Sequence, residues 1–478
     1  MSKSKRIIFI DFMRVLALLL MIEGHTTYDF LDLAIRDGSS TGIQIWTNIR
    51  GYTAPFFLMV SGAVFAYLLL SQEKENGSNP RIKAGTRRVI TLFFWGYLLN
   101  FPLYIIGKIF TADGWDRFMN IRIGETLLTI FFIAIALYIY NSLQSDDDEK
   151  EAERAFMKHL LKRKGSNIIQ KARLVNRRFM RNEMRKKRLF SSFFYAVLIS
   201  ILYLIMTSLM TLDEKTKALR SDVLHIIGVG LLTVMLVYYL ATRFAPKNKR
   251  KIMGVVYFAL LLVAVGLYPL LNKVDFSNLP LFISAYLNNY GTKSMFTLSP
   301  WLAYIFAGGL MGIWLDYEMR KGFTEFKIGL KLLLAGLTLT TLANLGNRFE
   351  IYYYGKSYYW YDSPNLVYYR MGVVLLVGSV MAFISIYIKD LPKFLKQMAR
   401  NTLWLYVGHL VIIYQIVKPI IGYQTRFSLP IVLIFVAIMY VLMYLQTRII
   451  IYVKDENGGY IALFKKWFLK DKNRSIQP

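Results

Sequence analysis

Three ionisable side chains follow one stripe of an apolar segment near the start of the chain. Asp11, Arg14 and His25 lie within residues 7–28, a run long enough to cross a bilayer as a helix. Because a helix turns by about 100° per residue, eleven steps bring His25 back to within roughly 20° of Arg14. Ionisable groups at membrane depth are costly and face protein or water, so this stripe is a candidate functional site.

The side chains of this stripe indicate which chemistry it could carry. Imidazole titrates near neutral pH, which suits His25 to act as a general base. The planar fork of Arg14 can donate to a carbonyl or a phosphate group, or it can pair with Asp11. The alternative for His25 is a purely interfacial position at a helix end, and its register with Asp11 and Arg14 favours a function.

The elements that must position these residues are membrane helices. Of the 478 residues, 55% are hydrophobic and 15% aromatic, and the mean hydropathy is +0.38, which is typical of a polytopic membrane protein. We expect an all-α bundle of about 12 transmembrane helices, within a range of ten to twelve. The expected spans are 7–28, 46–70, 89–110, 123–141, 190–211, 222–243, 252–271, 299–317, 328–346, 366–388, 401–422 and 429–451.

The net charge of +29 fits a membrane protein through the positive-inside rule. Lysine and arginine gather on alternate loops, and this pattern predicts that both termini are cytoplasmic. We therefore do not expect nucleic acid as a partner. The chain has no cysteine, which excludes disulfides, thiolate metal sites and cysteine nucleophiles. Its four histidines lack nearby pairs of carboxylates, so we expect no metal site.

The segment 142–190 differs from the membrane core. It begins with SDDDEKEAE, ends with RNEMRKKRLF and has apolar residues at helical spacing between them. We interpret it as a basic amphipathic cytoplasmic insert attracted to anionic lipid, with a solvated inner loop as the plainer alternative. The expected organisation is helices 1–4 in 1–141, the insert in 142–190, helices 5–12 in 191–452 and a basic cytoplasmic tail in 453–478.

Several further residues are candidates for the functional site, and each also has a purely structural interpretation. The third helix is expected to begin at Arg87 and Arg88. These arginines are interpreted either as membrane anchors or as residues that bind phosphates. His225 lies at the start of the sixth span and His409 inside the eleventh. Each is interpreted either as a structural hydrogen-bonding residue or as part of the site. In the same way, Trp301 and Asn347 could belong to an interfacial aromatic belt or contact a sugar; Asn347 begins an aromatic-rich loop over 347–363.

The order of these motifs resembles that of transmembrane acyltransferases. The motifs are an Asp-x-x-Arg helix that ends in His25, Pro55-Phe-Phe followed by Ser61-Gly62, and Arg87-Arg88. The chain is similar to the acyltransferase-3 family and, more closely, to bacterial relatives of the heparan-alpha-glucosaminide N-acetyltransferase catalytic domain. Segments 221–240, 298–315 and 399–414 strengthen the second likeness, which covers most of the chain except 142–190.

This resemblance implies a multi-pass enzyme of the bacterial plasma membrane. Such enzymes move an acyl group, here expected to be acetyl, from cytoplasmic acyl-CoA to a hydroxyl or amine of an extracytoplasmic glycan. Arg14 and His25 match the Arg and His of the family's first helix, and Asp11 would orient Arg14. Arg87 and Arg88 would hold the phosphates of acyl-CoA, a co-substrate rather than a tightly bound cofactor. The acceptor would contact the remaining candidates His225, His409, Trp301 and Asn347.

Three questions remain open at this stage. His25 could act as a general base or form an acyl-histidine intermediate. A transporter or flippase that uses Asp11, Arg14 and His25 as a buried relay is the main alternative function, although no internal repeat supports it. A third alternative function is a membrane scaffold organised by the 142–190 insert. Membrane lipids are expected partners, and a homodimer is left open.

Overall fold

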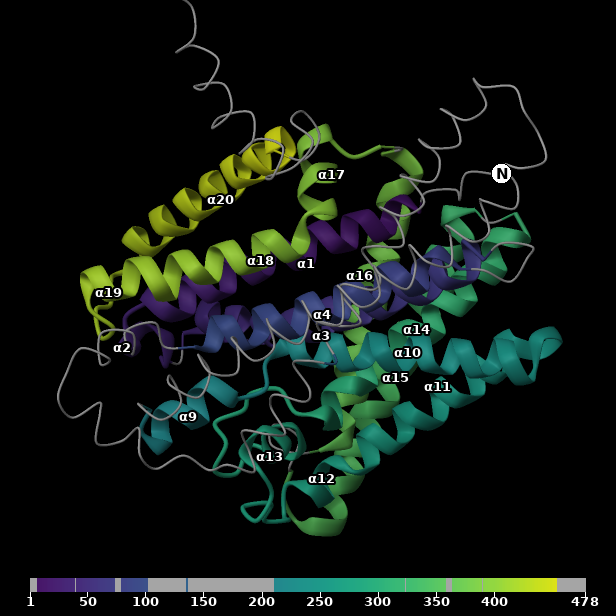
Figure 1. Cartoon of the computed structure of the whole chain (residues 1–478), viewed down its shortest axis with the longest axis horizontal. Coiled ribbons are helices and arrows are strands. Elements are labelled where there is room, and N and C mark those ends of the chain that lie inside the picture. Colours follow the sequence, from purple (N-terminus) through teal and green to yellow (C-terminus); the bar gives the residue numbers. More distant parts are fainter. Residues whose placement is uncertain are drawn as a thin grey trace, which may run out of the picture. The chain divides into compact units, whose positions relative to one another are not determined.

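The computed structural model describes residues 7–38, 40–73, 79–101, 135, 210–322, 324–357, 363–388 and 390–453. Within these ranges the regular structure is helical, and the one extended pairing is an isolated bridge between Leu31 and Phe427 (Figure 1). The prediction of an all-α fold is confirmed.

Eight helices of the described part are long and apolar enough to cross a membrane. All eight coincide with predicted spans. They are α3 (Thr41–Ser71), α10 (Val223–Phe244), Pro246–Leu271 with α11 (Lys249–Gly266), α14 (Leu298–Arg320), α15 (Glu325–Tyr354), α16 (Pro364–Tyr387), Thr402–Ile421 and α20 (Leu429–Ile451).

The first predicted span is also helical. Helix α1 (Ile8–Phe30) has 23 residues, which gives a length of about 34 Å and exceeds the roughly 30 Å of a bilayer core. Predicted spans 123–141 and 190–211, the insert 142–190 and the tail 453–478 lie outside the described residues, apart from the single residue 135. The total of 12 spans and the cytoplasmic termini therefore stay predictions.

The chain divides into two compact units. The first consists of Met1–Ser71, Leu236–Lys273 and Leu298–Pro478, and the second of Gln72–Met235 and Val274–Thr297. The predicted boundaries at 141 and 190 fall in the part of the chain that is not described.

In the first unit, α3 and α14 pack backbone against backbone. A Cβ atom at Gly308 would collide with the carbonyl of Met59, and one at Gly312 with the carbonyl of Ala63. Gly62 of α3 makes the matching approach to α14. Small residues promote membrane-helix packing by allowing such approaches. Gly62, Gly308 and Gly312 therefore allow the close packing of α3 against α14.

Helix α1 packs into the same unit with its apolar side. Phe9, Met13 and Leu18 are fully buried, and the Met13 side chain lies beside Gly378 of α16. On another side, the Tyr440 hydroxyl of α20 donates to the Leu19 carbonyl at 3.1 Å. Helix α1 thus contacts α16 and α20 on two of its sides.

Helix α3 differs from its predicted extent. The predicted span begins at residue 46, whereas α3 begins at Thr41, and Pro55 lies inside the helix. Since proline has no N–H, the Gly51 carbonyl loses its usual helical partner. At 31 residues the helix is about 46 Å long and exceeds the bilayer core. The helix therefore extends beyond the core, and its first turns carry Trp46 and Arg50.

The second unit contains α4 (Pro80–Asn100), α9 (Leu212–Leu219), α13 (Leu281–Leu287) and the first turns of α10. The side chain of Arg220 donates to Asn100 Oδ1 at 2.9 Å, and the Ser221 amide donates to Ser294 Oγ at 3.0 Å. These contacts hold the segment before α10 against the rest of the unit.

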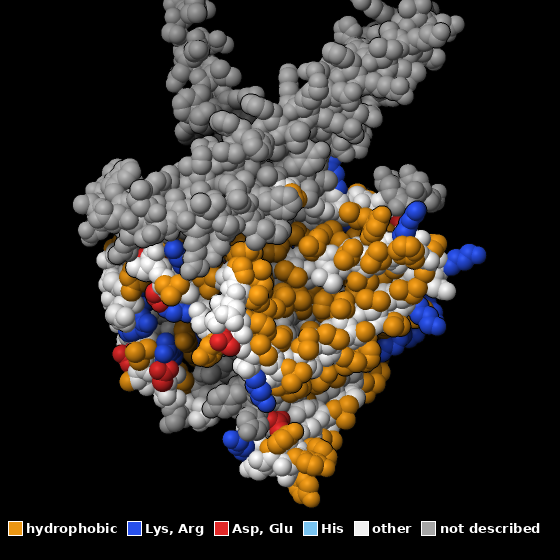
Figure 2. Space-filling view, turned by 60° about the horizontal axis from the view of Figure 1, so that its bottom comes forward, with side chains coloured by type: hydrophobic (Ala, Val, Ile, Leu, Met, Phe, Trp, Pro, Cys, Tyr) orange, Lys and Arg blue, Asp and Glu red, His pale blue; other side chains and the backbone are white. Residues whose placement is uncertain are grey.

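Large hydrophobic side chains are also exposed. Figure 2 shows a broad face on which they gather. The exposed set includes Phe258 and Leu262 of α11, and Leu334 and Leu342 of α15. A contiguous apolar surface of this kind suits contact with lipid, in agreement with a multi-pass membrane protein.

Candidate active site

The Asp11–Arg14 end of α1 is held against the short helix α17 (Lys393–Arg400). Arg14 Nη2 donates to the Ala399 carbonyl at 2.5 Å, and Arg14 Nη1 lies 3.8 Å from Asp11 Oδ1. The last carbonyls of a helix have no partner within it and form its negative end. Arg14 therefore caps α17 while it pairs with Asp11.

At the other end of α1, His25 meets a second histidine. The rings of His25 and His409 are 5.4 Å apart between centroids and inclined by 44°. His409 belongs to α18 (Thr402–Leu410), which lies beside α1 (Figure 1). The structure thus brings together two of the predicted site residues that are far apart in sequence.

His409 is fully buried and has a defined hydrogen bond on one nitrogen. Its Nδ1 lies 2.9 Å from the Leu405 carbonyl, which can only accept a hydrogen bond. Nδ1 must therefore carry the proton, and in the neutral ring Nε2 is left as an acceptor. Nε2 is buried without a hydrogen-bond partner. Buried polar atoms without a partner are unusual in proteins, and a bound water or a catalytic role can account for them.

Charged and aromatic groups surround His25. Asp29, one turn later, and Arg50 of α3 are its charged neighbours. The Arg50 guanidinium lies 4.0 Å from the centroid of the Tyr28 ring and 5.5 Å from that of Trp46. Asp29 and Arg50 carry opposite charges, so they act on His25 in opposite directions.

A π-helical segment supports this end of the site. Segment η2 (Val411–Val417) continues α18 and leads into α19 (Lys418–Ile421). Tyr414 in η2 donates to the Asp29 carboxylate, and Lys418 Nζ donates to the Asp29 carbonyl at 2.7 Å. Single π turns inside α-helices are frequent at functional sites. Here the segment fixes Asp29 from two positions of one helix.

Glu23 is also held firmly. Its Oε1 accepts hydrogen bonds from Trp46 Nε1 and from Thr27 Oγ1, both at 2.8 Å. The bond to Trp46 ties α1 to the start of α3 close to the position of Arg50.

The predicted donor-binding residues lie in the second unit. Arg87 and Arg88 occupy α4, which begins at Pro80 and so extends beyond the predicted start of its span. Arg87 is half-buried and Arg88 is exposed.

His225 is fully buried in the same second unit. Its Nδ1 lies 2.8 Å from Asp222 Oδ1, its ring is 4.3 Å from that of Tyr97 between centroids, and its Nε2 has no hydrogen-bond partner. The Tyr97 and Tyr286 hydroxyls beside it are 3.0 Å apart. Burial, followed by the influence of Tyr97, raises the pKa of Tyr286 far above its ordinary value, so this hydroxyl stays neutral.

The remaining predicted contacts have other neighbours. Trp301 packs against Tyr304, with 5.8 Å between ring centroids, and Asn347 Oδ1 accepts a hydrogen bond from Ser357 at 2.7 Å. Both belong to the first unit. Any contact of these residues with an acceptor stays a prediction.

Sequence reasoning missed several groups around His25. They share one property, which is that each is an ionisable or hydroxyl side chain in or beside a predicted span: Glu23, Asp29, Arg50, Tyr414 and Lys418. The rule that singled out Asp11 and Arg14 could have found the charged ones, because ionisable groups within membrane helices are costly. Among the described residues, no group of three histidine, aspartate or glutamate side chains could hold a metal ion.

Comparison with known proteins agrees with the resemblance stated above. Residues 6–142 match the family heparan-alpha-glucosaminide N-acetyltransferase, catalytic. The matched stretch contains α1, α3 and α4, and with them Asp11, Arg14, His25, Arg87 and Arg88. No curated protein and no solved structure matches the chain. The family match supports a membrane acetyltransferase that acts on glycans.

Proposed function

We propose that this protein transfers an acetyl group from cytoplasmic acetyl-CoA to a hydroxyl or amine of an extracytoplasmic glycan, in the bacterial plasma membrane. The observation that carries the proposal is the environment of His25. This imidazole lies beside a second buried imidazole, between Asp29 and Arg50, on a helix within the stretch that matches an acetyltransferase catalytic family.

His25 acts as the general base in this proposal. The acceptor oxygen or nitrogen attacks the thioester carbonyl and loses its proton to His25. A carbon–oxygen or carbon–nitrogen bond forms, the carbon–sulfur bond breaks, and the proton passes to the CoA thiolate. General base catalysis of this kind typically contributes about 10²- to 10⁴-fold. The rival route places the acetyl group on the His25 ring first and transfers it in a second step.

Arg14 would serve a different part of the donor. Arg14 lies eleven positions before His25, which corresponds to about 16 Å along the helix axis. One compact group cannot contact both side chains, whereas the extended arm of acetyl-CoA can. Arg14 would hold this arm while Asp11 orients it, and Arg87 and Arg88 would bind the phosphates through charge-assisted hydrogen bonds. The acceptor would contact His409, His225, Trp301 and Asn347.

The test is acetyl transfer by the purified full-length protein in proteoliposomes. We would supply acetyl-CoA with a labelled acetyl group on one side and glycans with free hydroxyls or amines on the other. The proposal expects CoA release together with a labelled glycan, and the loss of both in His25→Ala.

A different outcome would favour the transporter alternative. Unmodified substrate that accumulates in the vesicles, without CoA release, would show that the ionisable groups of α1 form a relay rather than an active site. That result would overturn the transferase proposal.

A further inference from the structure

One buried carboxylate in the first unit holds two arginines together. Asp316 of α14 is 2% exposed, and its Oδ2 accepts hydrogen bonds from Arg250 Nε of α11 at 2.8 Å and from Arg320 Nε at 3.0 Å. Because both bonds end on the same oxygen, the two guanidinium groups lie close to each other. One negative charge therefore serves two positive charges, and this arginine pair, Arg250 with Arg320, has an excess positive charge.

The arginine pair is held in place while much of its hydrogen-bonding capacity is unused. Each guanidinium donates to Asp316 through Nε, and within the described ranges the Nη groups of Arg250 and Arg320 make no hydrogen bond. The two side chains are 38% and 56% exposed, so a ligand can reach them. Guanidinium groups bind phosphate through parallel hydrogen bonds, and the fixed pair therefore suits a phosphate group.

Both arginines lie at the end of a candidate membrane span. Arg250 belongs to the first turn of α11, within Pro246–Leu271, and Arg320 is the last residue of Leu298–Arg320. A helix that spans the hydrocarbon core has its ends at the level of the lipid headgroups. Residues 243–251 and 316–331 carry nine lysines and arginines against three aspartates and glutamates. Basic pockets between membrane helices bind the headgroups of anionic lipids.

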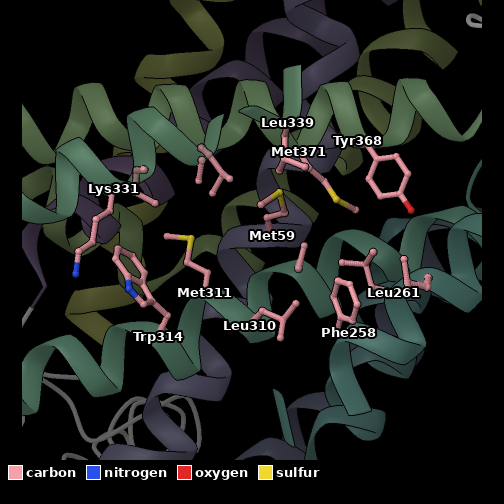
Figure 3. Close-up of a pocket in the computed structure, with 15 residues that line it drawn as sticks. Met59, Phe258, Leu261, Leu310, Met311, Trp314, Lys331, Leu339, Tyr368 and Met371 are labelled. Carbon is pink, nitrogen blue, oxygen red and sulfur yellow. The ribbon is translucent and has the colours of Figure 1, made fainter. Parts of the chain in front are cut away.

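The second carboxylate on this part of α14 does not neutralise the arginine pair. Glu318 Oε1 accepts a hydrogen bond from Lys331 Nζ of α15 at 2.6 Å, so these two side chains neutralise each other. Figure 3 shows Lys331 beside Trp314, at one end of an apolar pocket. The excess positive charge of the arginine pair is therefore left for a ligand.

An open apolar surface begins next to the arginine pair. Gly254 lies one turn beyond Arg250 on α11, and no atom lies within 4 Å of its Cβ position. Phe258, one further turn along the same face, is 54% exposed, and Val255 is 62% exposed. A phosphate bound to Arg250 thus has an apolar surface beside it, which suits a phosphate that carries hydrocarbon chains.

We propose that the arginine pair binds the phosphate group of an anionic phospholipid, whose acyl chains lie on the apolar surface of α11 beyond Gly254. The unused guanidinium donors account for the phosphate, and the excess positive charge accounts for a lipid with a net negative charge. The location at the ends of two spans and the exposed apolar side chains favour a lipid over a soluble phosphate compound. This lipid site does not depend on the acetyl transfer proposed above.

The first test compares four ligands on the full-length protein in a neutral detergent. Thermal unfolding is measured against dipalmitoyl phosphatidylglycerol, dipalmitoyl phosphatidylcholine, glycerol 3-phosphate and coenzyme A. Phosphatidylglycerol should bind saturably and about tenfold or more tightly than phosphatidylcholine, whose choline group neutralises its phosphate. Glycerol 3-phosphate should give no shift, and coenzyme A should not displace phosphatidylglycerol. Equal binding of the two lipids would overturn the proposal, and so would displacement of phosphatidylglycerol by either soluble phosphate compound.

The second test locates the site with charge-matched variants. Arg250→Gln and Arg320→Gln each leave Asp316 with one arginine partner, so both should fold, and each should bind phosphatidylglycerol about tenfold less tightly. Lys251→Gln removes the same charge from an exposed side chain beside the pair and should leave the affinity unchanged. Arg320→Lys keeps the charge but loses the fork; it should also bind less tightly, and it serves if a glutamine variant does not fold. An equal loss of affinity in Lys251→Gln and Arg250→Gln would indicate non-specific attraction and overturn the proposal.

Discussion

His25 differs from the other ionisable residues of α1 in the hydrogen bonding of its side chain. Asp11 and Arg14 pair with each other, Glu23 accepts two hydrogen bonds, and Asp29 is bound by Tyr414. No hydrogen bond of the His25 ring is present within the described residues. The His25 ring packs against that of His409 but leaves its polar atoms for a ligand, which is why we propose His25 as the general base.

The first prediction concerns His25→Ala. Loss of the base should lower the rate of acetyl transfer by about 10²- to 10⁴-fold and leave the melting temperature close to that of the natural protein. Since imidazole accepts a proton only in its neutral form, the rate of the natural protein should fall on acidification. The measurement is the initial rate of CoA release across a pH series. Leu20→Ala on the same helix is the control, and full activity of His25→Ala would exclude the proposed role.

The second prediction concerns Arg14. Arg14→Lys keeps a positive charge near Asp11 but loses the planar fork that reaches the Ala399 carbonyl. We expect a folded protein whose KM for acetyl-CoA rises, with a smaller change in the affinity for the acceptor. Steady-state kinetics with each substrate varied in turn would measure this. If KM for acetyl-CoA stays unchanged while the melting temperature falls, Arg14 is purely structural.

At the scale of elements, the contact of α3 with α14 explains how the site is held. In a bilayer, lipid is as apolar as leucine, so helix association depends on close packing rather than on the hydrophobic effect. The glycines at 62, 308 and 312 bring the two backbones into direct contact. The same helix α3 carries Arg50 toward His25, so the packing of α3 against α14 positions one wall of the candidate active site.

The third prediction tests this packing. Gly308→Ala places a methyl group against the Met59 carbonyl, and overpacking of this kind typically costs about 1–3 kcal/mol. Gly254→Ala in α11 is the matched control, because no atom lies within 4 Å of its Cβ position. There the gain in helix propensity of about 1 kcal/mol should raise the melting temperature. Equal effects of the two variants in thermal unfolding would contradict close packing at Gly308.

The sequence predicted the positions of these helices better than it predicted which residues they contact. Apolar length located all eight long apolar helices of the described part, because hydrophobic thickness constrains every membrane span alike. It placed the start of α3 five residues too late, at 46 instead of Thr41, since the polar residues Thr41 and Gln44 continue the helix beyond the apolar run. The helical periodicity of α1 predicted that Arg14 and His25 share a face. It could not indicate that this face meets Ala399 and His409, because contacts over almost 400 residues depend on the tertiary fold.

At the scale of the whole molecule, the residues predicted for one reaction are distributed over both compact units. His25, His409 and Arg14 belong to the first unit, and Arg87, Arg88 and His225 to the second. The protein as a whole, rather than either unit alone, is the appropriate sample for ligand binding.

The fourth prediction follows for the intact protein in nanodiscs. Acetyl-CoA at a hundred times its dissociation constant should stabilise the folded state by about 2.7 kcal/mol. The increase in melting temperature should saturate, and it should shrink in Arg87→Gln and in Arg14→Lys. Desulfo-CoA, which lacks the thioester but keeps the phosphates, is a useful comparison. Absence of any shift with acetyl-CoA or with longer acyl-CoAs would contradict a donor site.

The hydrogen bond between Arg14 and the Ala399 carbonyl has a consequence for how the protein is made. The two residues are 385 positions apart, and synthesis at about 5–20 residues per second separates them by roughly 20–80 s. During that interval α1 must stay in the membrane before α17, η2 and His409 exist. Asp11, one turn from Arg14, can pair with the guanidinium during this interval. In chains stalled on the ribosome before residue 399, we therefore expect Asp11→Asn to impair the membrane insertion of α1 more than it does in the complete protein.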